Sequence, residues 1–179
     1  LNRLLEDLYQ LSLSDIGALT YRKADIDLAE VLEDSIESYK EEFAGKDIRV
    51  SRDIQKRPAI AVFADKERIH QLFSNLLDNS LKYTDRKGEL IVRLAYHDGQ
   101  AVINFQDSSP GVLPDEFVRL FDRLYRSEHS RNRSSGGAGL GLAICKNIAE
   151  AHDGTIAAYP SPLGGVMVTV TIPFAGRRT

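Results

Sequence analysis

Two alternating segments joined by a tight turn constrain the fold of this chain more than any other feature of its sequence. Apolar and polar residues alternate along 90–96 and 101–105, and Asp98-Gly99 between them is typical of two-residue hairpin turns. A further alternating segment, 166–172, lies near the end of the chain. A strand with one apolar face must bury that face against a second layer. The pattern therefore predicts a largely antiparallel sheet that is covered on one side.

Helical segments are expected to provide that cover. Residues 65–83 carry apolar side chains at helical spacing, and Asp65 is a suitable N-cap for them. The other predicted elements are helices over 27–43, 115–124 and 140–152, strands over 48–54 and 59–63, and a turn at Gly164-Gly165 before the last strand. We predict an α/β (α+β) two-layer sandwich, in which helices cover one face of a mixed, mostly antiparallel sheet.

The first residues form a separate helical pattern. Their leucines alternate in steps of three and four: Leu1, Leu4, Leu8 and Leu11. Such spacing is typical of a helix that packs against another helix, and a helix over 1–17 is too short to be stable alone. We expect its partner to lie upstream or in a second copy of the chain. The alternative is an amphipathic helix that folds back on its own domain.

Composition argues against several classes of partner. The chain has 23 basic and 26 acidic residues, mixed along its length, and a net charge of -3, so it has no broad field to attract nucleic acid or an anionic membrane. No apolar run approaches the ~20 residues needed to cross a bilayer. Cys145 is the single cysteine and is interpreted as a small hydrophobic residue on a helix. A single cysteine cannot form an internal disulfide, which indicates a reducing compartment. We expect a soluble piece of a longer protein.

The polar face of segment 65–83 is the first candidate for chemistry. It presents Gln71, Asn75, Asp78, Asn79 and Lys82. Two asparagines at i and i+4, followed by a lysine, place two amide oxygens and an ammonium along one line. Neutral oxygens suit a Mg²⁺ ion that already has phosphates and waters as ligands. The alternative is a solvated polar face.

A carboxylate at the end of a strand is the second candidate. Asp107 is followed by Ser108-Ser109-Pro110-Gly111. A carboxylate in this position can accept a hydrogen bond from the exocyclic amine of adenine, whereas guanine presents an oxygen there and would be rejected. The alternative is an aspartate that caps a Pro-Gly turn.

Glycines at the start of the last helix form the third candidate. The run 136–141 frees backbone N–H groups to approach an anion at a helix N-terminus, although a flexible hinge would need the same residues. The run matches neither a Walker loop nor the dinucleotide fingerprint. The polar stretch 127–137 before it is predicted to be a mobile lid. Segment 117–126 carries Arg123 and Arg126, which we expect to be free to reach a polyphosphate.

The order of these elements resembles the catalytic domain of sensor histidine kinases, within the wider group of Bergerat-fold ATPases that includes gyrase, the Hsp90 chaperones and MutL. Residues 75–84 resemble the asparagine box of those kinases, and 117–126 resemble the phenylalanine box. Asp107 begins the first glycine box, and 137–141 form the second. The resemblance covers about residues 25–173. Ser109 departs from the pattern, which usually has a glycine there.

The resemblance implies a role for each matching residue. Asn79 would be the principal Mg²⁺ ligand, and Asn75 would lie beside it near the phosphates. Arg126 would face the γ-phosphate, so Asn75 and Arg126 would be the catalytic residues. Asp107 would read the adenine amine. The remaining contacts to ATP would come from Lys82, Tyr83, Gly111, Arg131, Arg133, Gly137, Gly139, Leu140, Gly141 and Leu142.

Asn75 also favours a kinase over a hydrolase. The gyrase and chaperone relatives have a water-activating glutamate four residues before the Mg²⁺ asparagine, and an amide cannot act as a general base. The acceptor should be a histidine followed by an acidic residue and a Thr-Pro-type helix start. The histidines of the chain lack that context: His70, His97, His129 and His152. An ATP hydrolase and a non-catalytic nucleotide-sensing or dimer-forming module are the rival functions.

The resemblance finally implies a place for the chain in a larger protein. The γ-phosphate of ATP would pass to a histidine outside this chain and then to an aspartate of a response regulator receiver domain. Residues 1–20 would end the helical dimerisation and phosphoacceptor domain, and 21–179 would form the catalytic domain. The full-length protein would be a homodimer in the bacterial inner membrane, with this part in the cytoplasm. Membrane contact would come only from missing segments, and no nucleic acid would bind.

Overall fold

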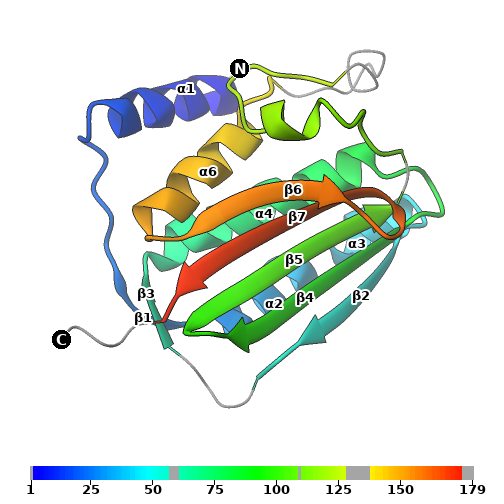
Figure 1. Cartoon of the computed structure of the whole chain (residues 1–179), viewed down its shortest axis with the longest axis horizontal. Helices are drawn as coiled ribbons and strands as arrows, with labels where there is room; N and C mark the ends of the chain where they lie inside the picture. The colour runs from blue at the N-terminus through cyan, green and yellow to red at the C-terminus, as the bar shows by residue number, and fades with distance from the viewer. Residues whose placement is uncertain (1, 57–60, 109, 128–137, 175–179) are drawn as a thin grey trace.

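A five-stranded sheet forms one layer of the molecule (Figure 1). The computed structural model describes residues 2–56, 61–108, 110–127 and 138–174. The strands of this sheet are β2 (Arg49–Ile54), β4 (Glu89–His97), β5 (Gln100–Ser108), β6 (Thr155–Pro160) and β7 (Gly164–Pro173). They lie in the order β2-β4-β5-β7-β6; β2 runs parallel to β4, and the other neighbours are antiparallel. The predicted mixed, mostly antiparallel sheet is confirmed.

The hairpin between β4 and β5 turns at Asp98-Gly99, as its sequence predicts. Both residues have positive φ angles, 49° and 77°, which two-residue turns of type I′ require. The turn sets the register, so that Leu94 pairs with Ile103 and Val92 with Phe105. All four side chains are buried. One face of the hairpin is therefore buried in the core.

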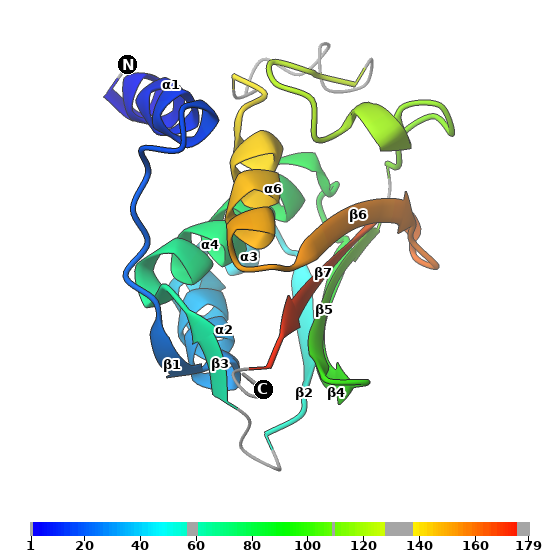
Figure 2. The ribbon, with the colours of Figure 1, turned by 60° about the vertical axis from the view of Figure 1, so that its left-hand side comes forward.

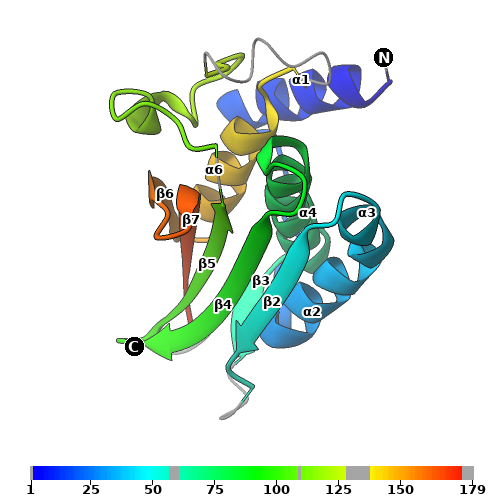
Figure 3. The same ribbon diagram turned by 90° about the vertical axis from the view of Figure 1, so that its right-hand side faces the viewer.

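Helices α2 (Leu28–Ser38), α4 (Lys66–Tyr83) and α6 (Gly141–Ala151) cover that face (Figures 2 and 3). α4 packs between α2 and α6. Its apolar stripe includes Leu72, Phe73 and Leu76, and the Phe73 ring lies 6.1 Å from the ring of Phe105 on β5. Each such side chain contributes on the order of 1.5–3 kcal/mol when fully buried. The predicted two-layer sandwich is confirmed.

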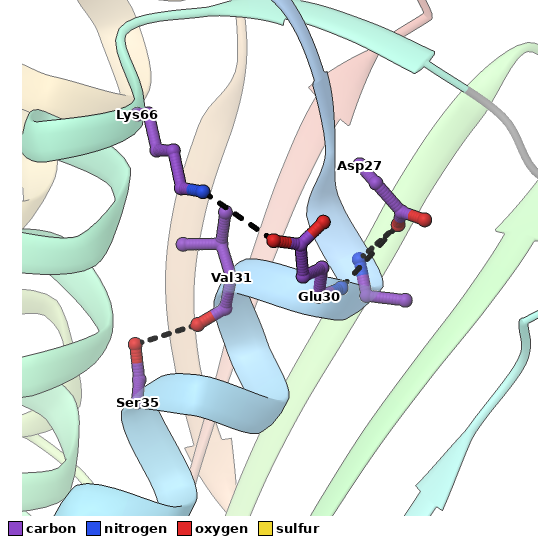
Figure 4. A network of polar contacts seen from close by, with 6 residues as sticks. Asp27, Glu30, Val31, Ser35 and Lys66 are labelled. Carbon is purple, nitrogen blue, oxygen red and sulfur yellow. Dashed lines mark hydrogen bonds and ion pairs between the residues drawn. The ribbon is translucent and has the colours of Figure 1, made fainter.

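A second, two-stranded sheet extends the helical layer. β1 (Ala24–Asp27) pairs antiparallel with β3 (Ala61–Ala64). β1 is not predicted from the sequence, because a four-residue strand with two aspartates has low strand propensity and forms only when a distant partner supplies its hydrogen bonds. Asp27 then ends the strand and caps α2, accepting a hydrogen bond from the Ala29 N–H at 2.9 Å (Figure 4).

Three predicted elements differ from the structure. The helix expected over 27–43 breaks at Tyr39 (φ -102°, ψ 4°), and α3 (Lys40–Gly45) follows in a direction that buries Phe43. The helix expected over 115–124 shortens to one 3₁₀ turn, η1 (Phe117–Arg119). The last hairpin turns at 161–163, and Gly164 is already the first residue of β7.

The first helix, α1 (Asn2–Asp15), folds back on the domain, which is the alternative arrangement for this segment (Figure 1). Leu11 is buried, and Gln10 exchanges hydrogen bonds with Gln71 of α4 at 2.8 and 3.3 Å. Asn147 of α6 donates to Ser14 at 3.0 Å. Within the described part of the chain, no helix combines the length and the hydropathy that a membrane span requires.

Candidate nucleotide site

A cavity of about 300 Å³ lies between α4, the start of α6 and the adjoining ends of β5 and β7. It is lined by all the described residues to which the family resemblance gives a role at the nucleotide: Asn75, Asn79, Lys82, Tyr83, Asp107, Gly111, Arg126, Gly139, Leu140, Gly141 and Leu142. Arg131, Arg133 and Gly137 lie outside the described residues, as does most of the predicted lid. Folding thus gathers residues that are up to 67 positions apart in the sequence, as Asn75 and Leu142 are.

Asn75 and Asn79 lie one turn apart on α4, and both line the cavity. Asn75 is buried, and its Nδ2 donates to the Gly141 carbonyl at 3.4 Å, which ties the middle of α4 to the start of α6. A Cβ at Gly141 would lie 3.9 Å from the Asn75 Cγ, so the start of α6 approaches α4 closely here. The Nδ2 of Asn79 is buried and has no hydrogen-bond partner among the described residues. An unpaired buried amide costs on the order of 1–3 kcal/mol.

Asp107 lines the cavity from the end of β5. The β5–β7 register shifts between Gln106 and Ser108, and this irregularity leaves Asp107 without a partner in the β5–β7 ladder. Its Oδ1 accepts a hydrogen bond from the Val166 N–H at 2.7 Å, and its Oδ2 faces the Ser80 hydroxyl at 3.5 Å. Burial raises the pKa of the Asp107 carboxyl to about 7, although these two hydrogen bonds lower it. A carboxyl that changes charge near neutral pH therefore lines the cavity.

Gly165 provides the space that Asp107 occupies. A Cβ at Gly165 would lie 2.3 Å from the Asp107 Oδ1 and 2.5 Å from the Ser108 carbonyl oxygen. Only glycine allows the two strands to approach so closely. Gly164-Gly165 is predicted from the sequence only as a turn, and neither this contact nor the place of Ser80 beside Asp107 is predicted. The glycine pair is visible in the sequence, but only the strand register shows that Asp107 is the residue packed against Gly165.

The glycine-rich segment reaches the cavity at the start of α6. Gly139 has a φ of 73°, and a Cβ there would lie 2.6 Å from the Tyr125 carbonyl oxygen. The Gly139 carbonyl accepts a hydrogen bond from the Leu124 N–H at 3.0 Å, which fixes the segment before the predicted lid. No side chain caps the N-terminus of α6 among the described residues. The first amides of α6 therefore remain suited to an anion.

The two arginines of segment 117–126 have different surroundings. Arg126 lines the cavity and is half-buried. Arg123 does not; its exposed guanidinium forms an ion pair with Asp15 of α1, with Nη1 2.6 Å from Oδ2. The prediction that Arg123 is free to reach a polyphosphate is therefore wrong. Leu4 and Asp7 of α1 also line the cavity, and the leucine spacing of that helix gives no signal for this.

His152 and Cys145 have structural environments. His152 is buried; its Nε2 accepts from the Asp65 N–H at 2.9 Å, and its Nδ1 lies 2.7 Å from the Ile148 carbonyl. Burial lowers the pKa of His152. Cys145 is fully buried against α4, and burial raises the pKa of its thiol. The interpretation of Cys145 as a small core residue agrees with this position.

Known proteins share both the sequence and the fold. Residues 64–176 match the family described as histidine kinase-, DNA gyrase B-, and HSP90-like ATPase. The chain is 49% identical over 173 residues to the signal transduction histidine-protein kinase BaeS of Escherichia coli (strain K12), covering 97% of this chain and 37% of BaeS. The name of this relative agrees with the sensor histidine kinase family that the sequence motifs resemble.

Solved structures give the same fold. Acinetobacter baumannii histidine kinase AdeS superimposes with a TM-score of 0.79 over 98% of this chain and 79% of that chain, at 23% identity. Full-length ShkA in complex with AMPPNP superimposes with a TM-score of 0.81 over 99% of this chain and 36% of that chain, at 24% identity. The chain spans little more than a third of the length of BaeS. It belongs to the histidine kinase-, DNA gyrase B-, and HSP90-like ATPase family.

Proposed function

We propose that this domain binds Mg-ATP in the cavity and presents the γ-phosphate to a histidine nitrogen on a helical domain outside this chain. One observation carries the proposal. The carboxyl of Asp107 and the amides of Asn75 and Asn79 line the same cavity, although they come from a strand end and from a helix. A nucleotide with a donor at its base and a cation at its phosphates fits that arrangement.

The Asp107 side of the cavity suits the base. Val166 holds one carboxylate oxygen at 2.7 Å, so the other oxygen can accept a hydrogen bond from the adenine amine. Apolar side chains from β5 and β7, Phe105 and Val168, line the cavity beside it and can pack against a planar ring. Guanine would place an oxygen against the carboxyl, which leaves two acceptors facing each other. The site should therefore prefer adenine.

The α4 and α6 side of the cavity suits the phosphates. Lys82 supplies a positive charge, and the amides at the start of α6 supply N–H donors. The side chain of Asn79 fits a Mg²⁺ ion, because it lines the cavity and an amide oxygen is a ligand of the kind that Mg²⁺ accepts next to phosphates and waters. Such an ion would draw charge away from the leaving ADP.

The proposed reaction is an in-line displacement. A P–N bond forms to the acceptor histidine while the bond from the γ-phosphorus to the bridging oxygen of ADP breaks. Arg126 stabilises the charge that spreads over the transferred group. Asn75 cannot remove a proton from water, so hydrolysis has no general base at that position. The phosphoryl group would then pass to an aspartate of a response regulator.

The names of the relatives support the wider context. BaeS and AdeS are histidine kinases, and we infer that this chain likewise works with a histidine-containing helical domain and a response regulator. We further propose that residues 1–20 end that helical domain, that the whole protein is a homodimer in the bacterial inner membrane, and that this part lies in the cytoplasm.

Calorimetric titration tests the proposal. Mg-ATP should bind the wild-type chain, Mg-GTP should bind at least about tenfold more weakly, and Asp107→Asn should lose most of the ATP affinity because its amide presents a donor beside the adenine amine. Binding of both nucleotides with equal affinity would contradict the assignment of the base site. Rapid steady-state phosphate release by this chain would favour the rival hydrolase. Absence of label on an added histidine domain, despite bound ATP, would favour a nucleotide-sensing module.

A further inference from the structure

The C-terminal end of α4 is capped by a side chain, whereas the ends of α3 and α6 are capped by the backbone. The last carbonyls of a helix have no intrahelical partner and need another donor. After α6, the N–H groups of Asp153 and Gly154 donate to the carbonyls of Glu150 and Ala149 at 3.0 and 2.9 Å, with Asp153 at φ 57°. This is a Schellman motif, in which the backbone satisfies its own helix end.

α3 ends in the same way, and the motif presents Lys46. The N–H of Asp47 donates to Ala44 at 3.0 Å and that of Ile48 to Phe43 at 2.9 Å, with Asp47 at φ 56°. Phe43 and Ile48 are both buried, which gives the hydrophobic contact that accompanies this motif. Lys46 is therefore held between two fixed positions of the backbone.

The ammonium of Lys46 closes the end of α4. Its Nζ donates to the carbonyl oxygens of Leu81 and Thr84 at 2.6 Å each and lies 3.3 Å from that of Lys82. Thr84 is extended (φ -68°, ψ 134°), and its N–H donates to the Ser80 carbonyl. An ammonium has three donors, and a positive charge at a helix C-terminus also interacts favourably with the helix dipole. One side chain thus binds the backbone on both sides of Lys82-Tyr83.

We propose that Lys46 is a positioning residue of the nucleotide site, which holds the backbone of Lys82 and Tyr83 so that their side chains face the phosphate side of the cavity. Both residues line that cavity, and both lie in the last turn of α4, where helices otherwise fray. Lys46 itself does not line the cavity. The inference rests on the proposed ATP site, because it concerns the contact of Lys82 with phosphate.

The test compares nucleotide binding in two variants with matched chemistry. Lys46→Met keeps the aliphatic stem and removes the three donors. Lys66→Met is the control, since it removes a lysine from the opposite end of α4, where Lys66 forms an exposed ion pair with Glu30 at 3.5 Å (Figure 4). Mg-ATP affinity is measured by calorimetry, and adenosine affinity by displacement of a fluorescent ATP analogue. Thermal melting followed by circular dichroism checks that each variant is folded.

The expected result is a split between the two ligands. Lys46→Met should weaken Mg-ATP binding about five- to tenfold and adenosine binding less than about twofold, because only the phosphates contact Lys82. Lys66→Met should change neither affinity by more than about twofold. In the Lys82→Ala background, Lys46→Met should have no further effect on ATP binding, since residues that act through one contact are not additive. If Lys46→Met does not fold, the Mg-ATP and adenosine affinities are compared in the same way for Lys46→Gln, which keeps two N–H donors.

The other outcomes contradict either the role of Lys46 or the proposed function. An equal loss of affinity for ATP and adenosine would show general loosening of the domain and would overturn the inference. An unchanged ATP affinity in Lys46→Met, or a full additional loss in the double variant, would also overturn it. If the wild-type chain binds no ATP, the proposed function itself fails, and this result is distinct from the failure of Lys46 alone.

Discussion

Replacing Asp107 by asparagine should stabilise the fold while it removes nucleotide binding. The pKa of this carboxyl rises from an ordinary value of 3.8 to about 7 in the folded state, because burial penalises its charged form. In the unfolded chain the group ionises above about pH 4. Between these two values the folded state binds more protons than the unfolded state, so stability falls as the pH rises through this window. Above pH 7 the full cost is present.

The size of the effect follows from the difference between the two pKa values. Each pKa unit corresponds to about 1.4 kcal/mol, so the rise from 3.8 to about 7 sets an upper limit of about 4 kcal/mol. Asp107 is partly accessible from the cavity, and solvent screening reduces the expected cost to about 1–2 kcal/mol. The side-chain amide of the Asp107→Asn variant would keep an oxygen to accept the 2.7 Å hydrogen bond from the Val166 N–H. For a chain of this size, the gain corresponds to a rise in Tm of about 2–8 °C at pH 8.

Thermal melts of the wild type and Asp107→Asn at pH 8 and pH 4.5 measure the effect. The difference in Tm should be largest at pH 8 and should shrink at pH 4.5, where the wild-type carboxyl is protonated in the folded state. Asp34→Asn, at an exposed position of α2, controls for the loss of one negative charge. An Asp107→Asn variant that is less stable than the wild type at pH 8, or a Tm difference that does not depend on pH, would refute the reasoning.

Three further predictions concern Gly165, His152 and Asn79. Gly165→Ala places a Cβ 2.3 Å from the Asp107 Oδ1 and should cost about 2 kcal/mol or more in urea unfolding and at least tenfold in ATP affinity; unchanged values would exclude the close approach. His152 has a lowered pKa, so its unfolded form protonates first as the pH falls below about 6.5, and stability should fall there. Melts of His152→Gln between pH 7.5 and 5.5 should show less of this fall, and an identical slope would contradict it. Asn79→Ala should abolish the Mg²⁺ dependence of ATP binding in titrations with and without Mg²⁺, while a retained dependence would move the ion elsewhere.

The sequence alone determined those elements whose pattern is local. The type I′ turn at Asp98-Gly99 and the N-cap of α4 at Asp65 need only their neighbours along the chain, so both were predictable. The polar stripe of α4 was also visible, because residues at i and i+4 always share a helix face. For the same reason the sequence alone predicts Asn75 and Asn79 as site residues.

Tertiary structure decided the features that depend on a distant partner. β1 forms because β3 lies beside it, α1 folds back because Gln71 and Asn147 meet it, and Arg123 is drawn to Asp15 rather than to the cavity. The space that Gly165 leaves for Asp107 and the hold of Lys46 on the last turn of α4 join segments that the sequence separates by 58 and 35 to 38 residues. Short-range periodicity carries no information about such pairings, because strand register and the docking of helix ends are fixed by packing across the whole core.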